Sequence, residues 1–266
     1  MNQLVYEYYK LRSRSAENPP KHLVEIVGTE SESLFRELAA ISLPVDIKRP
    51  VVADLSKWEI VTDWVGMSPR PALVVLRATY GYAYIDPLFA AYIRGSRQAG
   101  YPTWAYHFFL YTQNWRSQAD TYLRTVKAQG ITPDFKPVFD IEGYLPSGMS
   151  RATANGMIEN WLSYVENTLG KSCVLYSSRN YLNQLYAVVP PAWLTNPSRL
   201  KWVAGYPNDP NLYSDMPIWY RPVGMPEDPA LWQYSDKARF IGITGAVDVS
   251  DMSDWYEAIF SNPVGC

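Results

Sequence analysis

Short apolar runs recur along the chain from residue 50 onward, separated by turn residues or by segments of helical periodicity. Runs of this kind, apolar throughout, are typical of strands that are buried on both faces of a parallel sheet. Eight of them are predicted to be strands, at residues 51–55, 72–79, 101–110, 136–143, 173–177, 201–204, 231–234 and 246–249.

Three segments between the earlier strands carry apolar residues at helical spacing. One opens at Asp86-Pro87, an N-cap followed by a first-turn proline, and closes at Gly100. The other two cover residues 115–129 and 150–170. Alternating strands and helices predict an α/β fold with a parallel sheet, and eight strands predict closure into a β/α barrel of the TIM-barrel type.

Residues 1–48 differ from the rest of the chain in composition. Charged residues are dense there, two prolines are adjacent at positions 19 and 20, and a short helix is expected over residues 31–41. We expect an N-terminal extension, either packed on the main domain or reserved for a partner. Residues 49–266 are predicted to form a single catalytic barrel domain, because the sequence contains no internal repeat and no second core.

Charge and residue counts exclude several classes of protein. With 24 Lys and Arg against 26 Asp and Glu, the chain lacks the basic excess of a nucleic-acid-binding protein. No apolar run approaches the roughly 18 residues of a membrane span, so no membrane insertion is expected. Two His and two Cys residues have no metal-ligand spacing, so neither a metal nor another cofactor is expected. Residues 1–11 lack the apolar core of a signal peptide, which predicts synthesis in the cytoplasm without one.

The fourth predicted strand ends in two carboxylates, Asp140 and Glu142. Alternation along a strand places residues two positions apart on one face. Paired carboxylates are the equipment for acid/base cleavage of a glycosidic bond. An isolated Asp-x-Glu is more often a turn-capping aspartate followed by a solvated glutamate, so the pair by itself is a weak signal.

Two further aspartates are expected at the same place. Asp54 ends the first predicted strand and Asp248 lies near the end of the eighth, and these strands are neighbours in a closed barrel. Chemistry in such barrels collects at the carboxyl ends of the strands. Asp54, Asp140, Glu142 and Asp248 are therefore the candidate catalytic residues, and their mutual repulsion is expected to keep a proton available near neutral pH.

Aromatic residues are abundant, with 21 Tyr, 10 Trp and 8 Phe. Most belong to the core, but Tyr and Trp also suit stacking on sugar rings. Alternation puts Tyr106 and Phe108 on one face of the third strand and His107 on the other, which favours a structural role for His107. The candidate substrate-binding residues are Tyr106, Phe108, Tyr176, Trp202, Tyr206 and Trp232.

Seven separate motifs, spread over residues 51–255, resemble glycoside hydrolase family 25 in their order. This family comprises the Chalaropsis-type lysozymes and includes many bacteriophage endolysins. The motifs are Asp54-Leu-Ser-Lys-Trp58, Arg77-Ala-Thr79 with Gly81, Asp86-Pro87, Ala105-Tyr-His-Phe-Phe109, Phe139-Asp-Ile-Glu142, Trp232-Gln-Tyr-Ser235 and Gly245-Ala-Val-Asp248.

The resemblance implies a flattened barrel of five β/α units followed by three strands. It also implies cleavage of the β-1,4 bond after N-acetylmuramic acid in bacterial peptidoglycan. Glu142 matches the general acid/base, and Asp140 matches the residue that orients the substrate's acetamido group or stabilises positive charge. Asp54 and Asp248 match flanking carboxylates. The chain departs from the family at Tyr80, where a glutamate is frequent, and after Asp248, where an asparagine is frequent.

The spacing of the pair leaves the mechanism open. Cα atoms two positions apart on a strand are about 6.5–7 Å apart. Retaining enzymes with a protein nucleophile need carboxyl groups about 5–5.5 Å apart and inverting enzymes about 6.5–9.5 Å, and side-chain flexibility spans both ranges. Substrate assistance by the sugar's own acetamido oxygen is our preferred hypothesis.

The sequence thus predicts a phage-encoded muramidase. Lysis machinery of the host cell or the virion itself would deliver it to the wall, and residues 1–48 would dock on other virion proteins in the second case. Two alternatives stay open. One is a non-catalytic glycan-binding or structural virion protein on the same barrel, and the other is a glucosaminidase or chitinase-like glycosidase.

Overall fold

The computed structural model describes residues 50–186, 190–206 and 229–252. Residues 1–48, with the helix expected over residues 31–41, lie outside the described residues. Within the described ranges, no helix is long and apolar enough to cross a membrane.

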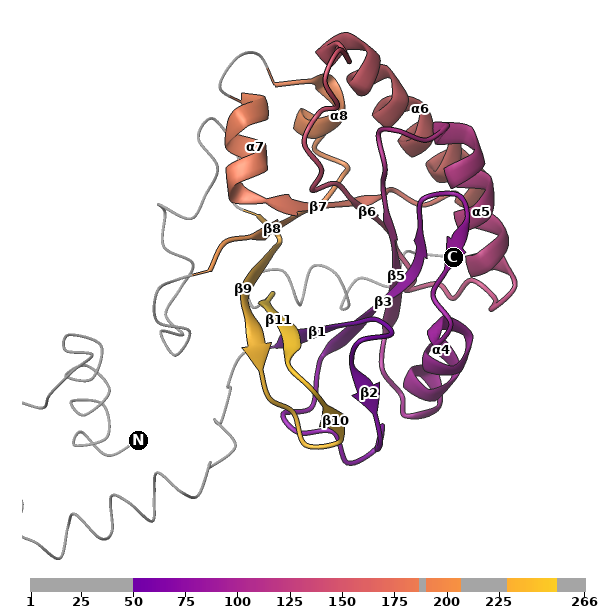
Figure 1. The fold of residues 1–266 in the computed structure, drawn as a ribbon. Helices are drawn as coiled ribbons and strands as arrows, with labels where there is room; N and C mark the ends of the chain where they lie inside the picture. The colour runs from indigo at the N-terminus through magenta and orange to yellow at the C-terminus, as the bar shows by residue number, and fades with distance from the viewer. Residues whose placement is uncertain (1–49, 187–189, 207–228, 253–266) are drawn as a thin grey trace, which may run out of the picture.

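Among the described residues, eight strands close into a barrel (Figure 1). Each of the eight predicted strands is present. Pairing of β1 with both β3 and β11 closes the ring, so the predicted α/β barrel is confirmed. The barrel strands are β1 Val51–Leu55, β3 Leu73–Tyr80, β5 Thr103–Phe108, β6 Pro137–Asp140, β7 Val174–Ser178, β8 Lys201–Ala204, β9 Leu231–Ala238 and β11 Val247–Asp251.

The last strand corrects the expectation of an entirely parallel sheet. The seven strands from β1 to β9 in the barrel run parallel, whereas β11 is antiparallel to both of its neighbours, β9 and β1. An antiparallel neighbour needs only a short connection, unlike a parallel one. Here that connection holds β10 Ile243–Thr244, which pairs with β2 Ile60–Val61. The beginning of β11, not its end, therefore lies at the carboxyl ends of the other strands.

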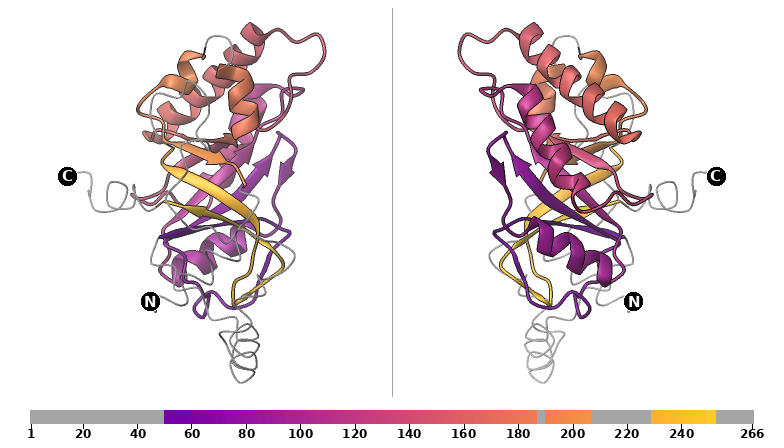
Figure 2. Two further views of the ribbon diagram at one scale, coloured as in Figure 1. Left: turned by 90° about the vertical axis from the view of Figure 1, so that its left-hand side faces the viewer. Right: turned by 90° about the vertical axis from the view of Figure 1, so that its right-hand side faces the viewer.

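Helices cover the outside of the barrel wall along β3 to β7 (Figures 1 and 2). The connection from β1 to β3 contains β2 and no helix, so four of the first five barrel strands are followed by helices. A short hairpin strand, β4 Tyr84–Ile85, extends β3. The helices are α4 Phe89–Gln98, α5 Trp115–Lys127, α6 Arg151–Leu169, α7 Arg179–Tyr186 and α8 Ala192–Thr195.

Local capping explains where the long helices start and stop. Asn114 and Ser150 accept hydrogen bonds from backbone N–H groups three residues on, each at 3.0 Å, which satisfies donors that the first helical turn leaves free. Gly170 ends α6 with a positive φ of 65°. The start predicted at Asp86 differs, because α4 begins at Phe89 and the Asp86 carboxylate accepts from Leu88 N–H just before it.

The core has two layers, one inside the barrel and one between the wall and the helices. Strand alternation sends odd and even positions to opposite sides of the wall. Val52, Leu73, Val75, Trp104, Val138, Val174, Trp202, Leu231 and Met252 fill the interior. The outer layer joins strand residues such as Leu76 and Phe139 to Ile158, Trp161 and Val165 of α6.

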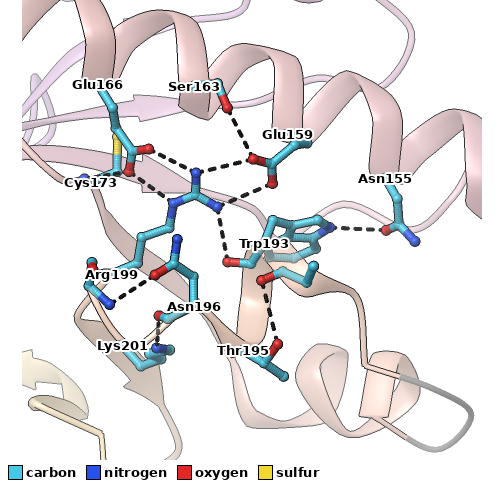
Figure 3. A network of polar contacts seen from close by, with 12 residues as sticks. Asn155, Glu159, Ser163, Glu166, Cys173, Trp193, Thr195, Asn196, Arg199 and Lys201 are labelled. Carbon is cyan, nitrogen blue, oxygen red and sulfur yellow. Dashed lines mark hydrogen bonds and ion pairs between the residues drawn. The ribbon is translucent and has the colours of Figure 1, made fainter.

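A buried arginine ties α6 to the α8 region (Figure 3). The Arg199 guanidinium, 3% exposed, binds Glu166 through two nitrogens at 2.9 and 2.8 Å and binds Glu159 at 3.2 Å. It also donates to the Trp193 carbonyl at 3.2 Å. Glu166 accepts in addition from Cys173 N–H at 2.9 Å, just before β7. The Arg199 cation thus connects α6, the loop after α8 and the beginning of β7.

Candidate active site

A polar layer lies directly above the apolar interior of the barrel. Residues two positions apart on a strand point to the same side of the barrel wall. On several strands, an apolar residue that fills the interior is followed two positions later by a polar residue, which therefore also points inward. Six strands follow this pattern: Val52 leads to Asp54, Val75 to Arg77, Trp104 to Tyr106, Val138 to Asp140, Val174 to Tyr176 and Leu231 to Gln233. We call this end of the barrel, where the parallel strands terminate, the mouth.

Asp54 and Asp248 lie side by side at one edge of the mouth. Their Cα atoms are direct partners in the antiparallel pairing of β1 with β11. Burial raises the pKa of Asp54 well above its usual range, and the charges of Asp248, Glu59 and Glu142 add to the rise. Burial, followed by the charges of Glu59, Asp236 and Glu142, raises the pKa of Asp248 to about 7. The site therefore retains a proton near neutral pH.

Asp140 and Glu142 differ in their surroundings although they are close in sequence. Asp140 is 5% exposed, and its Oδ1 atom is buried without a hydrogen-bond partner. Burial raises its pKa well above the usual range, with Glu142 and Asp54 adding to this effect. Ile141 packs into the outer core, and Glu142 emerges exposed beyond the end of β6. Loss of part of its hydration still raises the pKa of Glu142.

Two charged residues at the mouth were not predicted as site residues. Glu59 returns to the site through the loop after β1, where its Oε2 atom accepts from Ser56 N–H at 2.7 Å. Burial raises its pKa. Arg77 carries a positive charge that lowers the pKa of both Asp54 and Asp140 against the opposing effects. Only the tertiary path of the chain brings Glu59 near Asp54, so strand spacing could not identify it.

Asp86 holds Arg77 in place. Its Oδ2 atom accepts from Arg77 Nε at 2.9 Å and lies 2.8 Å from Arg77 Nη2. The same oxygen accepts from Lys57 N–H at 3.1 Å. The Asp-Pro motif thus orients a cation at the mouth in addition to preceding a helix.

Phe108 begins a row of aromatic side chains at the end of β5. Its Cα partner in β6 is Asp140, and its ring stacks on Tyr80 with centroids 4.8 Å apart. Tyr80 meets Tyr84 edge to face at 6.5 Å. Lys57 Nζ lies 5.3 Å from the Tyr84 ring and 4.4 Å from the Trp58 ring, which is 71% exposed. We refer to Phe108, Tyr80, Tyr84 and Trp58 as the aromatic row.

Three tyrosines from the predicted set face the carboxylates. Tyr106 is half-buried, and burial together with the charge of Asp54 raises its pKa well above the usual range. Tyr176 and Tyr206 donate their hydroxyl protons to one oxygen, Gln233 Oε1, at 2.7 and 2.8 Å. Gln233 was not predicted, although its alternation with Trp232 was a signal that one of the two faces inward.

Trp202 and Trp232 do not line a groove, which corrects their predicted role. Trp202, 1% exposed, fills the barrel interior below the mouth and donates to Ser250 Oγ at 2.9 Å. Trp232, 3% exposed, belongs to the outer core layer and donates to the Gly205 carbonyl at 2.7 Å. Since Gln233 faces inward, its neighbour Trp232 must face outward.

His107 has the structural place that alternation predicted. It is fully buried, with Nδ1 2.7 Å from Thr79 Oγ1 and Nε2 3.2 Å from Gln118 Oε1. Its ring stacks on Trp161. Burial lowers its pKa to about 3, so it stays neutral. Within the described ranges, no group of three or more His, Cys, Asp or Glu residues is arranged to hold a metal ion.

Comparison with known proteins identifies the family to which the barrel belongs. The model of the family "Glycosyl hydrolases family 25" matches residues 53–243, which include three of the four predicted carboxylates and end before Asp248. The chain belongs to glycosyl hydrolase family 25. This result confirms the family that the order of the sequence motifs predicted.

The matches to curated relatives cover only part of the length of each relative. The uncharacterized protein YegX of Escherichia coli (strain K12) is 28% identical over 208 residues, covering 73% of this chain and 66% of YegX. The autolytic lysozyme of Clostridium acetobutylicum is 25% identical over 183 residues, covering 68% of this chain and 49% of that protein. The chain therefore spans between about half and two thirds of these relatives.

The solved structure of a bacterial lysozyme shows the same fold. The crystal structure of the bacterial lysozyme from Streptomyces coelicolor superposes with a TM-score of 0.64 at 23% identity. The match covers 78% of this chain and 93% of the lysozyme chain. The fold is thus the irregular, eight-stranded mixed barrel of family 25.

Proposed function

We propose that this family 25 protein is an N-acetylmuramidase that hydrolyses bacterial peptidoglycan. It would cleave the β-1,4 bond between N-acetylmuramic acid and N-acetylglucosamine. The observation that carries the proposal is the pair at the end of β6, in which a buried Asp140 with an unpartnered oxygen precedes an exposed, protonatable Glu142. The Asp54 and Asp248 pair completes the carboxylate set.

Glu142 is assigned the proton transfer. It is exposed, so it reaches the glycosidic oxygen of a bound glycan, and its raised pKa favours the protonated form that a general acid needs. As the bond from C1 to the leaving sugar breaks, the Glu142 proton passes to the leaving oxygen. Glu142 then takes a proton from the water that attacks C1.

Asp140 is assigned to the acetamido group of the sugar. A buried carboxylate oxygen without a donor is costly, and a substrate N–H would satisfy it. Held in this way, the acetamido carbonyl oxygen attacks C1 as the leaving group departs, giving a cyclic cation that the Asp140 charge stabilises. Water then opens this ring and restores the acetamido group, so Asp140 forms no bond to the sugar.

Arg77 and the aspartate pair set the charge balance. Several carboxylates in one site repel one another, and the Arg77 cation, held by Asp86, partly offsets this repulsion. The charge of Glu142 in turn raises the pKa of Asp54 and Asp248, and burial raises the pKa of Glu142 itself. The site therefore combines one mobile proton with a negative field at the developing positive charge of the sugar.

Digestion of purified peptidoglycan tests the proposal. The wild type is expected to release new reducing ends that are muramic acid, and Glu142→Gln is expected to release almost none. Reducing ends that are glucosamine would instead identify a glucosaminidase or chitinase-like enzyme. Binding of the wall without new ends would identify a non-catalytic glycan-binding or structural protein.

We also propose that the protein is phage-encoded, is made in the cytoplasm and acts on the wall after delivery by lysis machinery or as a virion component. The proposal draws on residues 1–48, a charged stretch outside the family match. Deleting this stretch is expected to leave wall hydrolysis in solution intact and to abolish incorporation into virions. Loss of hydrolysis on deletion would instead show a packing role.

A further inference from the structure

Glu142, the proposed general acid, lies on a loop and not on a strand. β6 ends at Asp140, and the chain forms neither strand nor helix from Ile141 to Ser150. A functional group on a loop is held less precisely than one on a strand, so further contacts must fix its backbone. Such contacts are present immediately before Glu142.

Backbone pairing fixes the chain up to the N–H group of Ile141. The Asp140 carbonyl accepts from Phe109 N–H, just after β5, at 2.9 Å. On the other side, Ile141 N–H donates to the Tyr176 carbonyl of β7 at 3.0 Å. Asp140 and Tyr176 are the last Cα partners of β6 and β7. The next backbone polar group, the Ile141 carbonyl, lies beyond this pairing.

A side chain binds the Ile141 carbonyl at the point where the strand pairing stops. Ser177 Oγ donates to this carbonyl at 2.5 Å. Ser177 is 2% exposed and lies within β7, where its Cα partner is Val203 of β8. The Ile141 side chain is 1% exposed and packs in the outer core. Ile141 is thus fixed at its N–H group, its carbonyl and its side chain.

The hydrogen bond from Ser177 acts directly on the position of Glu142. The carbonyl group of Ile141 lies in one rigid plane with the nitrogen and Cα of Glu142, because the peptide bond is planar. Fixing this carbonyl therefore fixes the point from which the Glu142 side chain projects. Rotation of the plane would move the Glu142 carboxyl group relative to Asp140, which the strand pairing holds separately.

We propose that Ser177 is a positioning residue that, through the Ile141 carbonyl, holds Glu142 where it can transfer its proton. Ser177 itself takes no part in the proton transfer. The inference rests on the proposed role of Glu142 as the general acid, and it adds the residue that determines where that acid lies. The rival explanation is a purely structural hydroxyl, whose loss lowers stability and leaves turnover by the folded protein unchanged.

Ser177→Ala is the first test, with kcat and KM for peptidoglycan measured well below the unfolding temperature of the variant. The turnover number kcat is expected to fall about 10- to 100-fold, because a misplacement of about 1 Å can cost this much. KM is expected to change less than about twofold, since the buried Ser177 does not reach the glycan. An unchanged kcat would overturn the proposal.

Ser177→Thr tests whether the hydroxyl is responsible. It keeps a hydroxyl on the same carbon, so it is expected to recover most of the kcat lost in Ser177→Ala. Equal losses of kcat in the two variants would contradict the proposal. If Ser177→Ala does not fold, Ser177→Cys takes its place with the same expectations, because a thiol is only a weak hydrogen-bond donor.

Ser96→Ala serves as the matched control. Ser96 is a fully buried serine of α4 whose Oγ lies 2.7 Å from Thr103 Oγ1. Thr103 begins β5, so this hydroxyl pair lies at the end of the strand opposite to the mouth. Ser96→Ala is expected to lower thermal stability and to leave kcat unchanged. An equal fall of kcat in Ser96→Ala and Ser177→Ala would overturn the proposal, because lost stability would then explain both.

The mobility of the Glu142 backbone gives a test that needs no substrate. The order parameter of the Glu142 amide, measured by ¹⁵N relaxation and assigned from Glu142→Gln, is expected near about 0.85 in the wild type and below about 0.6 in Ser177→Ala. An unchanged order parameter in Ser177→Ala would overturn the proposal. If the wild type does not hydrolyse peptidoglycan, the proposed function fails, and this measurement still decides whether Ser177 fixes Glu142.

Discussion

Asp54 and Asp248 lie opposite each other in the antiparallel pairing of β1 with β11, so two carboxylates share one edge of the barrel mouth. Like charges directly opposite on neighbouring strands are destabilising. Burial and the nearby Glu59 and Glu142 add to this cost. The free energy of unfolding is therefore expected to decrease at the pH values at which these carboxylates lose their proton.

The first prediction is that Asp248→Asn stabilises the fold at alkaline pH. The pKa of Asp248 is about 7 in the folded protein, against 3.8 for an ordinary aspartate. Between these values the folded state holds more protons than the unfolded state, so stability falls as pH rises through this window. Asparagine cannot ionise. The free energy of unfolding is expected to match the wild type at pH 4 and to exceed it by on the order of 1 kcal/mol or more at pH 8.

Denaturant unfolding at both pH values checks this expectation. The exposed Asp134, changed to Asn, is the control and is expected to alter stability little at either pH. Equal stability of Asp248→Asn and the wild type at pH 8 would show that Asp248 is not repelled by its neighbours. Wall hydrolysis by Asp248→Asn is expected to fall, because its carboxylate belongs to the proposed catalytic set.

The second prediction concerns Asp140. Under substrate assistance, Asp140→Asn loses the negative charge that stabilises the cyclic cation, and kcat is expected to fall about 100-fold or more, the range typical of one lost catalytic group. Intact mass spectrometry of wild type quenched in acid during turnover is expected to show unmodified protein. A sugar adduct on Asp140 would rule out substrate assistance and show that Asp140 is the nucleophile.

The third prediction is that the aromatic row binds glycan. Tyr80→Ala is expected to raise KM for polymeric wall about 2- to 10-fold, because an aromatic contact is worth about 0.5–1.5 kcal/mol beyond its buried area. The turnover number kcat is expected to change little, since Tyr80 stacks on Phe108 and does not contact the carboxylates in the described structure. Ile241→Ala is the control, since Ile241 is also an exposed hydrophobic residue but pairs with Ser68 outside the aromatic row. Equal effects of the two changes on KM would argue against a glycan contact at Tyr80.

The fourth prediction concerns the Arg199 network. Arg199→Met leaves the Glu166 carboxylate, which is mostly buried, without its cation, and is expected to cost about 3–5 kcal/mol of stability. Arg116→Met removes an exposed pair with Asp120 and is expected to cost less than about 1 kcal/mol. Thermal unfolding of the two variants, measured side by side, makes the comparison. A loss for Arg199→Met no larger than that for Arg116→Met would show that the network adds little.

Much of the fold followed from local patterns in the sequence. Apolar runs located all eight strands, and apolar spacing located α4, α5 and α6, because each pattern depends only on neighbouring residues. The Asp140 and Glu142 pair was recognisable for the same reason. The motif order then identified the family before any distance was known.

The tertiary structure decided the direction of β11 and the membership of the site. Asp248 reaches the mouth because β11 runs antiparallel and brings its beginning there, whereas the sequence placed it near a strand end. Trp202 and Trp232 were predicted to line a groove but are buried in the structure. Gln233 and Glu59 were not predicted but lie at the mouth. Alternation states that neighbours face opposite ways, but only long-range pairing of strands determines which of the two faces is inside.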